Sequence, residues 1–213
     1  MTPGFWISSI TVAGHPTRQD SSVGFESGLN IIYGPSNSGK SWVLQCIDYV
    51  FGLKADDFVL DENSGYTEVR MGVRTAQGSL TLSRPIGEGA NNIEVSSTDP
   101  RIESGAYKRQ SSGRSPLLSS VWLKLIGYDD PDNLKIIKNQ NLETQALTWR
   151  TFWHALYADE DRISTKKPIL LPLQATAQPA FKCALASLIT GKDYAAYARD
   201  ESVETRKLRN NAI

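Results

Sequence analysis

The sequence has 213 residues, 40% of them hydrophobic and 22% charged, so the chain is long enough to bury one substantial core. Its 23 basic residues balance 23 acidic ones, which gives no sign of a pervasive nucleic-acid-binding surface but leaves room for a local patch. No apolar run approaches the ~20 residues that span a bilayer, and the first four residues do not resemble a secretory signal. We therefore expect a cytoplasmic protein with no membrane partner, in which Cys46 and Cys183 are free, buried thiols.

The first predicted elements lead into a glycine-bounded loop. Residues 5–12, Phe-Trp-Ile-Ser-Ser-Ile-Thr-Val, predict a strand, and the short apolar run at residues 29–33 predicts a second, buried strand. A helix is predicted over residues 42–51, where apolar side chains recur at helical spacing, and Gly52 stands at its C-cap position. The order strand, loop, helix is the context in which a phosphate-binding loop occurs.

Residues 34–41, Gly-Pro-Ser-Asn-Ser-Gly-Lys-Ser, match G-x-x-x-x-G-K-[ST], the phosphate-binding loop of nucleoside-triphosphate enzymes. Gly34 and Gly39 allow a tight turn whose N–H groups face phosphate oxygens, and the following helix adds its positive end. Lys40 is predicted to bridge the β- and γ-phosphates, and Ser41 to ligate Mg²⁺. An ordinary Gly/Ser-rich turn is the alternative, but it has no need of Lys-Ser after its second glycine. The predicted nucleotide contacts are Gly34, Pro35, Ser36, Asn37, Ser38, Gly39, Lys40, Ser41 and Trp42.

The remainder of the chain predicts a β-meander followed by helices. Three short segments rich in β-forming residues predict antiparallel strands at residues 66–74, 79–84 and 92–96. Arg84, at the end of the second, is interpreted as an exposed strand end rather than a phosphate contact. Residues 99–115 are interpreted as a mobile loop. Further elements are predicted at residues 115–126 (a helix capped by Ser115), 134–138 (a short strand), 149–157 (a helix), 176–189 (a helix closed by Gly191) and 192–213 (a charged helix).

The sequence shows only one half of a hydrolytic nucleotide site. Enzymes with this loop also carry an acidic residue directly after an apolar strand, where it holds Mg²⁺ and polarises water. Residues 123–130 come closest to such a segment, but Lys124 and Gly127 interrupt the apolar run. No Leu-Ser-Gly-Gly-type sequence occurs either. We expect the second half of the site to come from elsewhere.

The stretch G-L-N-I-I-Y-G-P-S-N-S-G-K-S at residues 28–41, followed by I-D-Y-V-F-G at residues 47–52, resembles the start of SMC-type and RecF/RecN-like ATPases. The resemblance is close over residues 28–52 and architectural over the rest. It implies a mixed α/β fold: the N-terminal lobe of an ABC-type P-loop ATPase head at residues 1–191, with an antiparallel β-meander and flanking helices. Residues 192–213 would begin a coiled coil, which suggests a fragment cut where that coil starts.

The same resemblance implies ATP hydrolysis in a composite site. A C-terminal lobe of the same head would supply the acidic strand and the ABC-type signature loop. Two heads would form a homodimer that encloses two ATP molecules with Mg²⁺. Closure of this dimer would be coupled to DNA in repair, chromosome maintenance or anti-phage defence, with accessory subunits as further partners.

Two departures from the family pattern affect the predicted site. The loop reads Pro-Ser-Asn-Ser where the family has Pro-Asn-Gly-Ser, so Asn37 and Ser38 must form the turn with fewer glycines. The family's glutamine, which contacts Mg²⁺ and the attacking water, is replaced by the acidic stretch at residues 159–161. We assign its role to Glu160 or Asp159, with Gln140 and Gln145 as alternatives. The predicted catalytic residues are therefore Lys40 and Glu160.

Two other classes of function are compatible with a phosphate-binding loop. A regulatory switch would bind nucleotide without turnover and thereby order a partner interface. A small P-loop kinase would be complete in one chain, but the β-meander after the loop helix does not fit the parallel sheet of a kinase. ATP binding with partner association but without phosphate release would favour the switch.

Overall fold

The computed structural model describes residues 4–14, 18–58, 60, 64–110, 115–139, 141–166 and 168–194. The chain divides into two compact units, Met1–Pro131 and Asp132–Ile213. This division falls inside the single lobe expected for residues 1–191. The expected start of a coiled coil at residues 192–213 lies almost entirely outside the described residues, so the predicted domain boundary at residue 191 stays a prediction.

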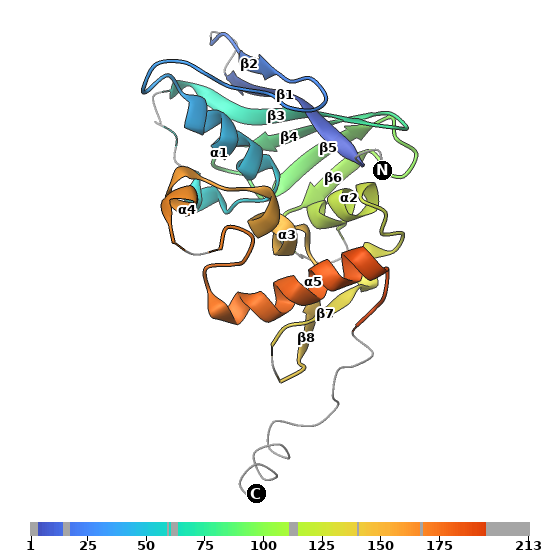
Figure 1. Ribbon diagram of the computed structural model, residues 1–213. Coiled ribbons are helices and arrows are strands. Elements are labelled where there is room, and N and C mark those ends of the chain that lie inside the picture. The colour runs from blue at the N-terminus through green and yellow to red at the C-terminus, as the bar shows by residue number, and fades with distance from the viewer. Residues whose placement is uncertain are drawn as a thin grey trace, which may run out of the picture. The chain divides into compact units, whose positions relative to one another are not determined.

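The first unit is built on one antiparallel sheet (Figure 1). Its spatial order is β2-β1-β3-β4-β5-β6, so four strands from β3 to β6 follow one another as a meander. Side chains alternate between the two faces: Val69, Met71 and Val73 are buried while Arg70 and Arg74 are exposed. The predicted first strand and meander are confirmed. The strands are β1 (Phe5–Gly14), β2 (Ser21–Gly24), β3 (Tyr66–Thr75), β4 (Ser79–Pro85), β5 (Asn92–Ser97) and β6 (Gly105–Lys108).

Two helices supply the rest of the first core. The predicted loop helix is α1 (Lys40–Val50), which contacts β1, β3 and β4 and buries Cys46, Tyr49 and Val50. Burial raises the pKa of the Cys46 thiol to about 12, so this cysteine is an inert core residue. Helix α2 (Leu118–Leu125) buries Trp122, whose ring lies 4.4 Å from the ring of Phe51 between centroids. A short 3₁₀ turn, η1 (Ala55–Asp57), follows α1.

Three sequence-based interpretations of the segments that follow α1 in this unit are wrong. Residues 99–115 are not one mobile loop, because Gly105–Lys108 pair with β5 as strand β6. The helix predicted from Ser115 begins at Leu118 and has Leu117, not a serine, at its N-cap. Arg84 is not an exposed strand end but is fully buried, with 0% of its surface exposed.

Arg84 connects the sheet to the end of α1. Its guanidinium donates hydrogen bonds to the carbonyl oxygens of Tyr49, Leu53 (2.9 Å) and Ala90 (2.7 Å). It also lies 3.8 Å from the centroid of the Tyr49 ring. The last carbonyls of a helix carry partial negative charge, so a buried cation at this point holds α1 against β4.

Asp99 is a carboxylate of the first unit with 1% of its surface exposed. It accepts hydrogen bonds from the Thr75 hydroxyl (2.5 Å) and from the backbone N–H (3.0 Å), Nε (2.9 Å) and Nη2 (2.7 Å) of Arg101. The hydrogen bonds from Arg101, which outweigh burial, lower the pKa of Asp99. These contacts close the turn between β5 and β6.

We expect Asp99 to make the stability of the first unit acid-sensitive. Because its folded pKa is lowered, its contribution is complete above the unfolded pKa, roughly 3.9, and is lost as pH falls towards the folded pKa. Asp99→Asn should therefore lower the free energy of unfolding by about 2 kcal/mol at pH 7 and by less at pH 3. Urea titrations at both pH values measure this difference. A loss that is equal at the two pH values would contradict an ionic role.

The second unit is a small assembly of helices on a two-stranded hairpin (Figure 1). Helix α5 packs against α3 and β7 and buries Phe181 and Ala184. The predicted short strand, the helix near residue 149 and the helix closed by Gly191 are confirmed. The 3₁₀ turn η3 (Pro131–Asn133) spans the division between the units. The further elements are β7 (Lys135–Ile137), β8 (Thr144–Ala146), α3 (Trp149–Leu156), α4 (Glu160–Ser164), η4 (Ala175–Ala177) and α5 (Gln178–Thr190).

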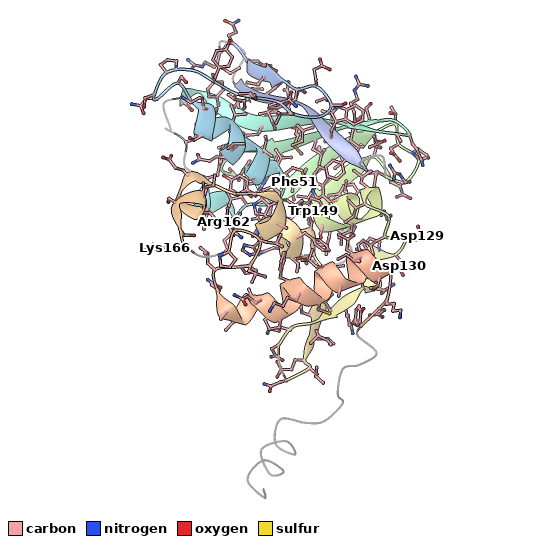
Figure 2. All side chains as sticks on the ribbon, viewed as in Figure 1. Phe51, Asp129, Asp130, Trp149, Arg162 and Lys166 are labelled. Carbon is pink, nitrogen blue, oxygen red and sulfur yellow. The ribbon has the colours of Figure 1, made fainter. Side chains whose placement is uncertain are left out.

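The buried Arg162 (Figure 2) ties the segment after α4 to α3. Its guanidinium donates to the carbonyl oxygens of His154 (3.0 Å), Ile169 and Leu171 (3.0 Å). The side chain of Asp159 caps α4 by accepting the Arg162 N–H at 2.8 Å. In the described part of the chain, every helix is too short or too polar to cross a lipid bilayer.

Candidate nucleotide-binding site

The loop at residues 34–39 turns through two residues with left-handed backbone conformation. Asn37 and Gly39 adopt left-handed conformations, with φ of 59° and 83°. Asparagine is one of the few non-glycine residues that tolerate this region, which explains how the loop turns at Asn37 without a glycine there. Left-handed residues within such a loop curl successive N–H groups towards one concavity. Gly39 is also the N-cap of α1, so the loop opens directly into the positive end of that helix.

Lys40 reaches back across the loop. Its Nζ donates to the carbonyl oxygens of Gly34 (3.0 Å) and Pro35 (2.5 Å) and lies 3.4 Å from the Ser38 hydroxyl oxygen. Within the described ranges its ammonium has no carboxylate partner. The first turn of α1 also contains no acidic residue. A positive charge held over this turn, without a counterion among the described residues, suits a phosphate ligand.

Ser41 and Trp42 occupy the next two positions of α1. Ser41 is exposed, so its hydroxyl is accessible to a metal ion held by a bound nucleotide. Trp42 is half-buried, with its ring centroid 6.1 Å from that of Phe58 and 6.2 Å from that of Tyr66. The Arg18 guanidinium lies 4.8 Å from the Tyr66 ring. Sequence patterns could not predict the contacts of Tyr66 with Trp42 and Arg18, because these residues are distant in the chain.

The predicted buried strand before the loop is not formed. Residues 29–33 have no strand assignment, and Leu29, Ile31 and Tyr33 are 88%, 76% and 90% exposed. An apolar run of this kind forms a strand only where a neighbouring strand can pair with it. The described sheet ends at β2 and does not include residues 29–33. The Asn30 side chain holds the turn before it by accepting the Glu26 N–H (2.9 Å) and donating to the Glu26 carbonyl (2.8 Å).

The residues proposed to replace the family's glutamine lie in the second unit. Glu160 is exposed in the first turn of α4, and Asp159 is engaged as the cap of that helix. Gln145 lies in β8, and Gln140 is outside the described residues. Asp159 therefore has a structural use, whereas Glu160 is accessible to solvent. The assignment of Glu160 to catalysis stays a prediction.

A family model described as an AAA domain matches residues 12–193. The chain belongs to the AAA domain family. This is an AAA-type ATPase domain found in SMC-like proteins, and such domains bind and hydrolyse nucleotide, usually with Mg²⁺. The matched region of the AAA domain includes the whole loop at residues 34–41 and parts of both compact units. A comparison with curated proteins found no match.

Proposed function

We propose that this AAA domain is the ATP-binding, N-terminal half of an SMC-like ATPase head. The observation that carries the proposal is the loop at residues 34–39, whose left-handed Asn37 and Gly39 lead into α1 while Lys40 spans the turn. An antiparallel sheet packed on the loop helix agrees with such a lobe. The same sheet counts against a P-loop kinase, whose core strands are parallel.

In this proposal the loop amides and Lys40 hold the triphosphate. Lys40 exchanges its bonds to Gly34 and Pro35 for bonds to phosphate oxygens, where negative charge accumulates during transfer. The Ser41 hydroxyl would be one ligand of Mg²⁺, and the ion would neutralise the negative charge that develops on the phosphates. Glu160, as the substitute for glutamine, orients the attacking water. The chain's own contribution to catalysis is therefore positioning and charge stabilisation.

A second lobe would complete the site. The exposed residues 29–33 support this step, because an apolar segment leading into the loop has no strand partner among the described elements. A strand from the C-terminal lobe of the same head would pair there and place its acidic end beside Mg²⁺. Two such heads would close as a homodimer on two ATP molecules. Coupling of closure to DNA, in repair, chromosome maintenance or anti-phage defence, and the use of accessory subunits follow the family scheme.

The proposal separates ATP binding from ATP turnover, and this separation can be measured. The 213-residue chain should bind a non-hydrolysable ATP analogue with Mg²⁺ in calorimetry but release almost no phosphate from ATP. Coexpression with a lobe that carries the acidic strand and signature loop should restore turnover, and Glu160→Gln should then reduce turnover without weakening ATP binding.

Two outcomes would contradict this proposal. Sustained turnover by the isolated chain would indicate a complete enzyme, such as a kinase. Nucleotide-dependent association with a partner, without phosphate release even from the completed head, would favour the regulatory switch.

A further inference from the structure

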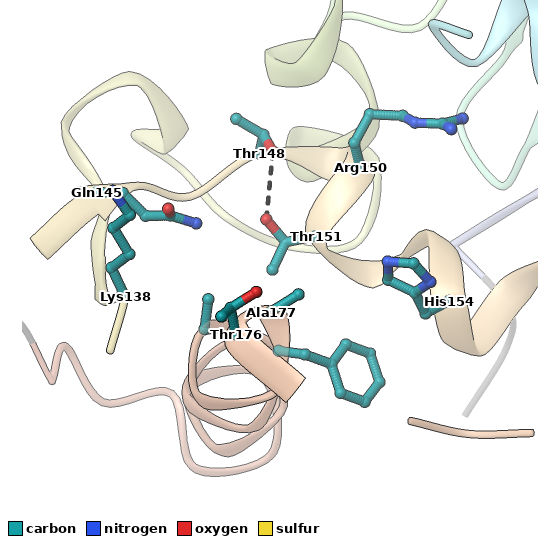
Figure 3. A pocket seen from close by; sticks show the side chains of 10 residues that line it. Lys138, Gln145, Thr148, Arg150, Thr151, His154, Thr176 and Ala177 are labelled. Carbon is teal, nitrogen blue, oxygen red and sulfur yellow. Dashed lines mark hydrogen bonds between the residues drawn. The ribbon is translucent and has the colours of Figure 1, made fainter. Parts of the chain in front are cut away.

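The second unit contains a cavity that the nucleotide site does not use. Its volume is about 400 Å³, and its walls come from the β7–β8 hairpin, the start of α3 and the start of α5 (Figure 3). A cavity of this size accommodates one small ligand. All of its lining residues belong to Asp132–Ile213, so the cavity is defined within one compact unit.

Polar side chains from three elements line this cavity. Thr148 and Thr151, at the start of α3, have their hydroxyl oxygens 3.2 Å apart. Gln145 approaches from β8 and Thr176 from the turn before α5, as Figure 3 shows. Each of these groups can donate a hydrogen bond. Ala180 and the buried Phe181 form an apolar wall beside them.

The charged side chains among the described lining residues are cations. Lys138 lines it from the end of β7, and Arg150 lines it from the first turn of α3. The guanidinium of Arg150 lies 4.9 Å from the centroid of the Trp153 ring, so Arg150 contributes charge more than a direct contact. Among the described lining residues there is no aspartate or glutamate. Glu143, across the hairpin, accepts a hydrogen bond from Asn139 at 2.8 Å.

The ring of His154, which also lines the cavity, lies near two arginine side chains. The pKa of His154 is lowered mainly by burial, and also by the positive charges of Arg162 and Arg150. Its Nδ1 lies 3.1 Å from Nη1 of Arg162. A guanidinium can only donate, so Nδ1 accepts this bond and the imidazole proton is on Nε2. His154 is therefore a neutral ring with one N–H donor, and the charged residues that line the cavity with it are Lys138 and Arg150.

Helices α3 and α5 both have their N-terminal ends at the cavity. Residues at the start of α3 and of α5 line the walls, and neither helix has an acidic residue in its first turn or a side-chain cap. Their positive ends add to the field of Lys138 and Arg150. Taken alone these helix ends would specify no ligand. Together with the cationic and hydroxyl lining, they favour a compact anion with several acceptor oxygens.

We propose that this cavity binds the phosphate group of a small ligand. Lys138 supplies the direct charge, the hydroxyls of Thr148 and Thr151 and the Gln145 amide donate to the phosphate oxygens, and the apolar wall takes the rest of the ligand. This site is separate from the loop at residues 34–41 and does not depend on the function proposed for that loop.

The test uses inorganic phosphate as the probe and removes the other phosphate site. Calorimetric titration of phosphate into the Lys40→Ala chain should show saturable binding with a dissociation constant of roughly 1 mM or below. Lys138→Gln and Thr151→Val, each in that background, should weaken phosphate binding about 5- to 10-fold, since each removes one charge-assisted hydrogen bond. Lys182→Gln, an exposed lysine of α5 that does not line the cavity, should leave it unchanged.

Three results would overturn the proposal. The first is no saturable phosphate binding in the Lys40→Ala chain. The second is binding that the two cavity variants and Lys182→Gln weaken equally. The third is binding of a single-stranded DNA oligonucleotide, weakened by the cavity variants, without binding of free phosphate; this would make the cavity part of a nucleic-acid surface. Thermal unfolding of each variant shows whether Thr151→Val keeps the unit folded.

Discussion

Lys40→Ala should weaken binding of ATP with Mg²⁺ by roughly 100-fold while leaving the fold intact. The ammonium of Lys40 has only loop carbonyls and a hydroxyl to bind, so it is available to exchange these for phosphate oxygens. Two or three charge-assisted bonds to a triphosphate would be lost with the side chain. Its present acceptors lie in an exposed loop and can bond to water instead, so the thermal midpoint should change little.

Calorimetry with a non-hydrolysable analogue checks the affinity, and circular dichroism checks the fold. Lys182→Ala is the matched control, because this lysine is exposed on α5 and belongs to neither proposed site. Removing it should leave ATP affinity unchanged. If Lys40→Ala binds the analogue as tightly as the unmodified chain, the loop at residues 34–41 is not the triphosphate site.

Arg84→Met should be the most destabilising of the substitutions considered, with a loss of about 3–5 kcal/mol in the free energy of unfolding. Methionine fills much of the same volume but cannot donate to the carbonyls of Tyr49, Leu53 and Ala90. These acceptors lie around a fully buried side chain, where water cannot replace the lost bonds. The stacking of the guanidinium on Tyr49 would also be lost.

Arg74→Met is the matched control for Arg84→Met. Arg74 is exposed on the neighbouring strand β3, so its replacement should change stability by less than about 0.5 kcal/mol. Urea midpoints of the two variants measure the difference. Because Arg84 holds the end of α1, Arg84→Met should also lower ATP affinity at temperatures where the unit is still folded. Equal midpoints for the two variants would contradict the structural role of Arg84.

Local patterns were sufficient to predict the elements whose signals are contained in one segment. The spacing of apolar residues predicted α1, α3 and α5, and the segments rich in β-forming residues at 66–74, 79–84 and 92–96 predicted three strands of the meander. The G-x-x-x-x-G-K-S pattern predicted the turn before α1. Asn37 shows the same agreement, since the missing glycine is replaced by a residue that tolerates positive φ.

Features that depend on distant partners were not predictable. Arg84 is buried because carbonyls 31–35 positions earlier in the chain receive its hydrogen bonds, and a charged residue at a strand end gives no sign of them. Residues 29–33 have a strand-like sequence but need a neighbouring strand to become one. The cavity of the second unit joins residues from β7 to α5, each of which has an ordinary role when considered alone.

The uncovered apolar stretch at residues 29–33 has a consequence for how the protein must be handled in the cell. Leu-Asn-Ile-Ile-Tyr is uncharged, rich in β-forming side chains and open along its backbone, which are the properties of a segment that recruits other copies into aggregates. Chaperones or rapid capture by a complementary polypeptide would therefore protect the newly made domain. Early assembly with the second lobe would then keep the domain soluble, in addition to completing the site for turnover.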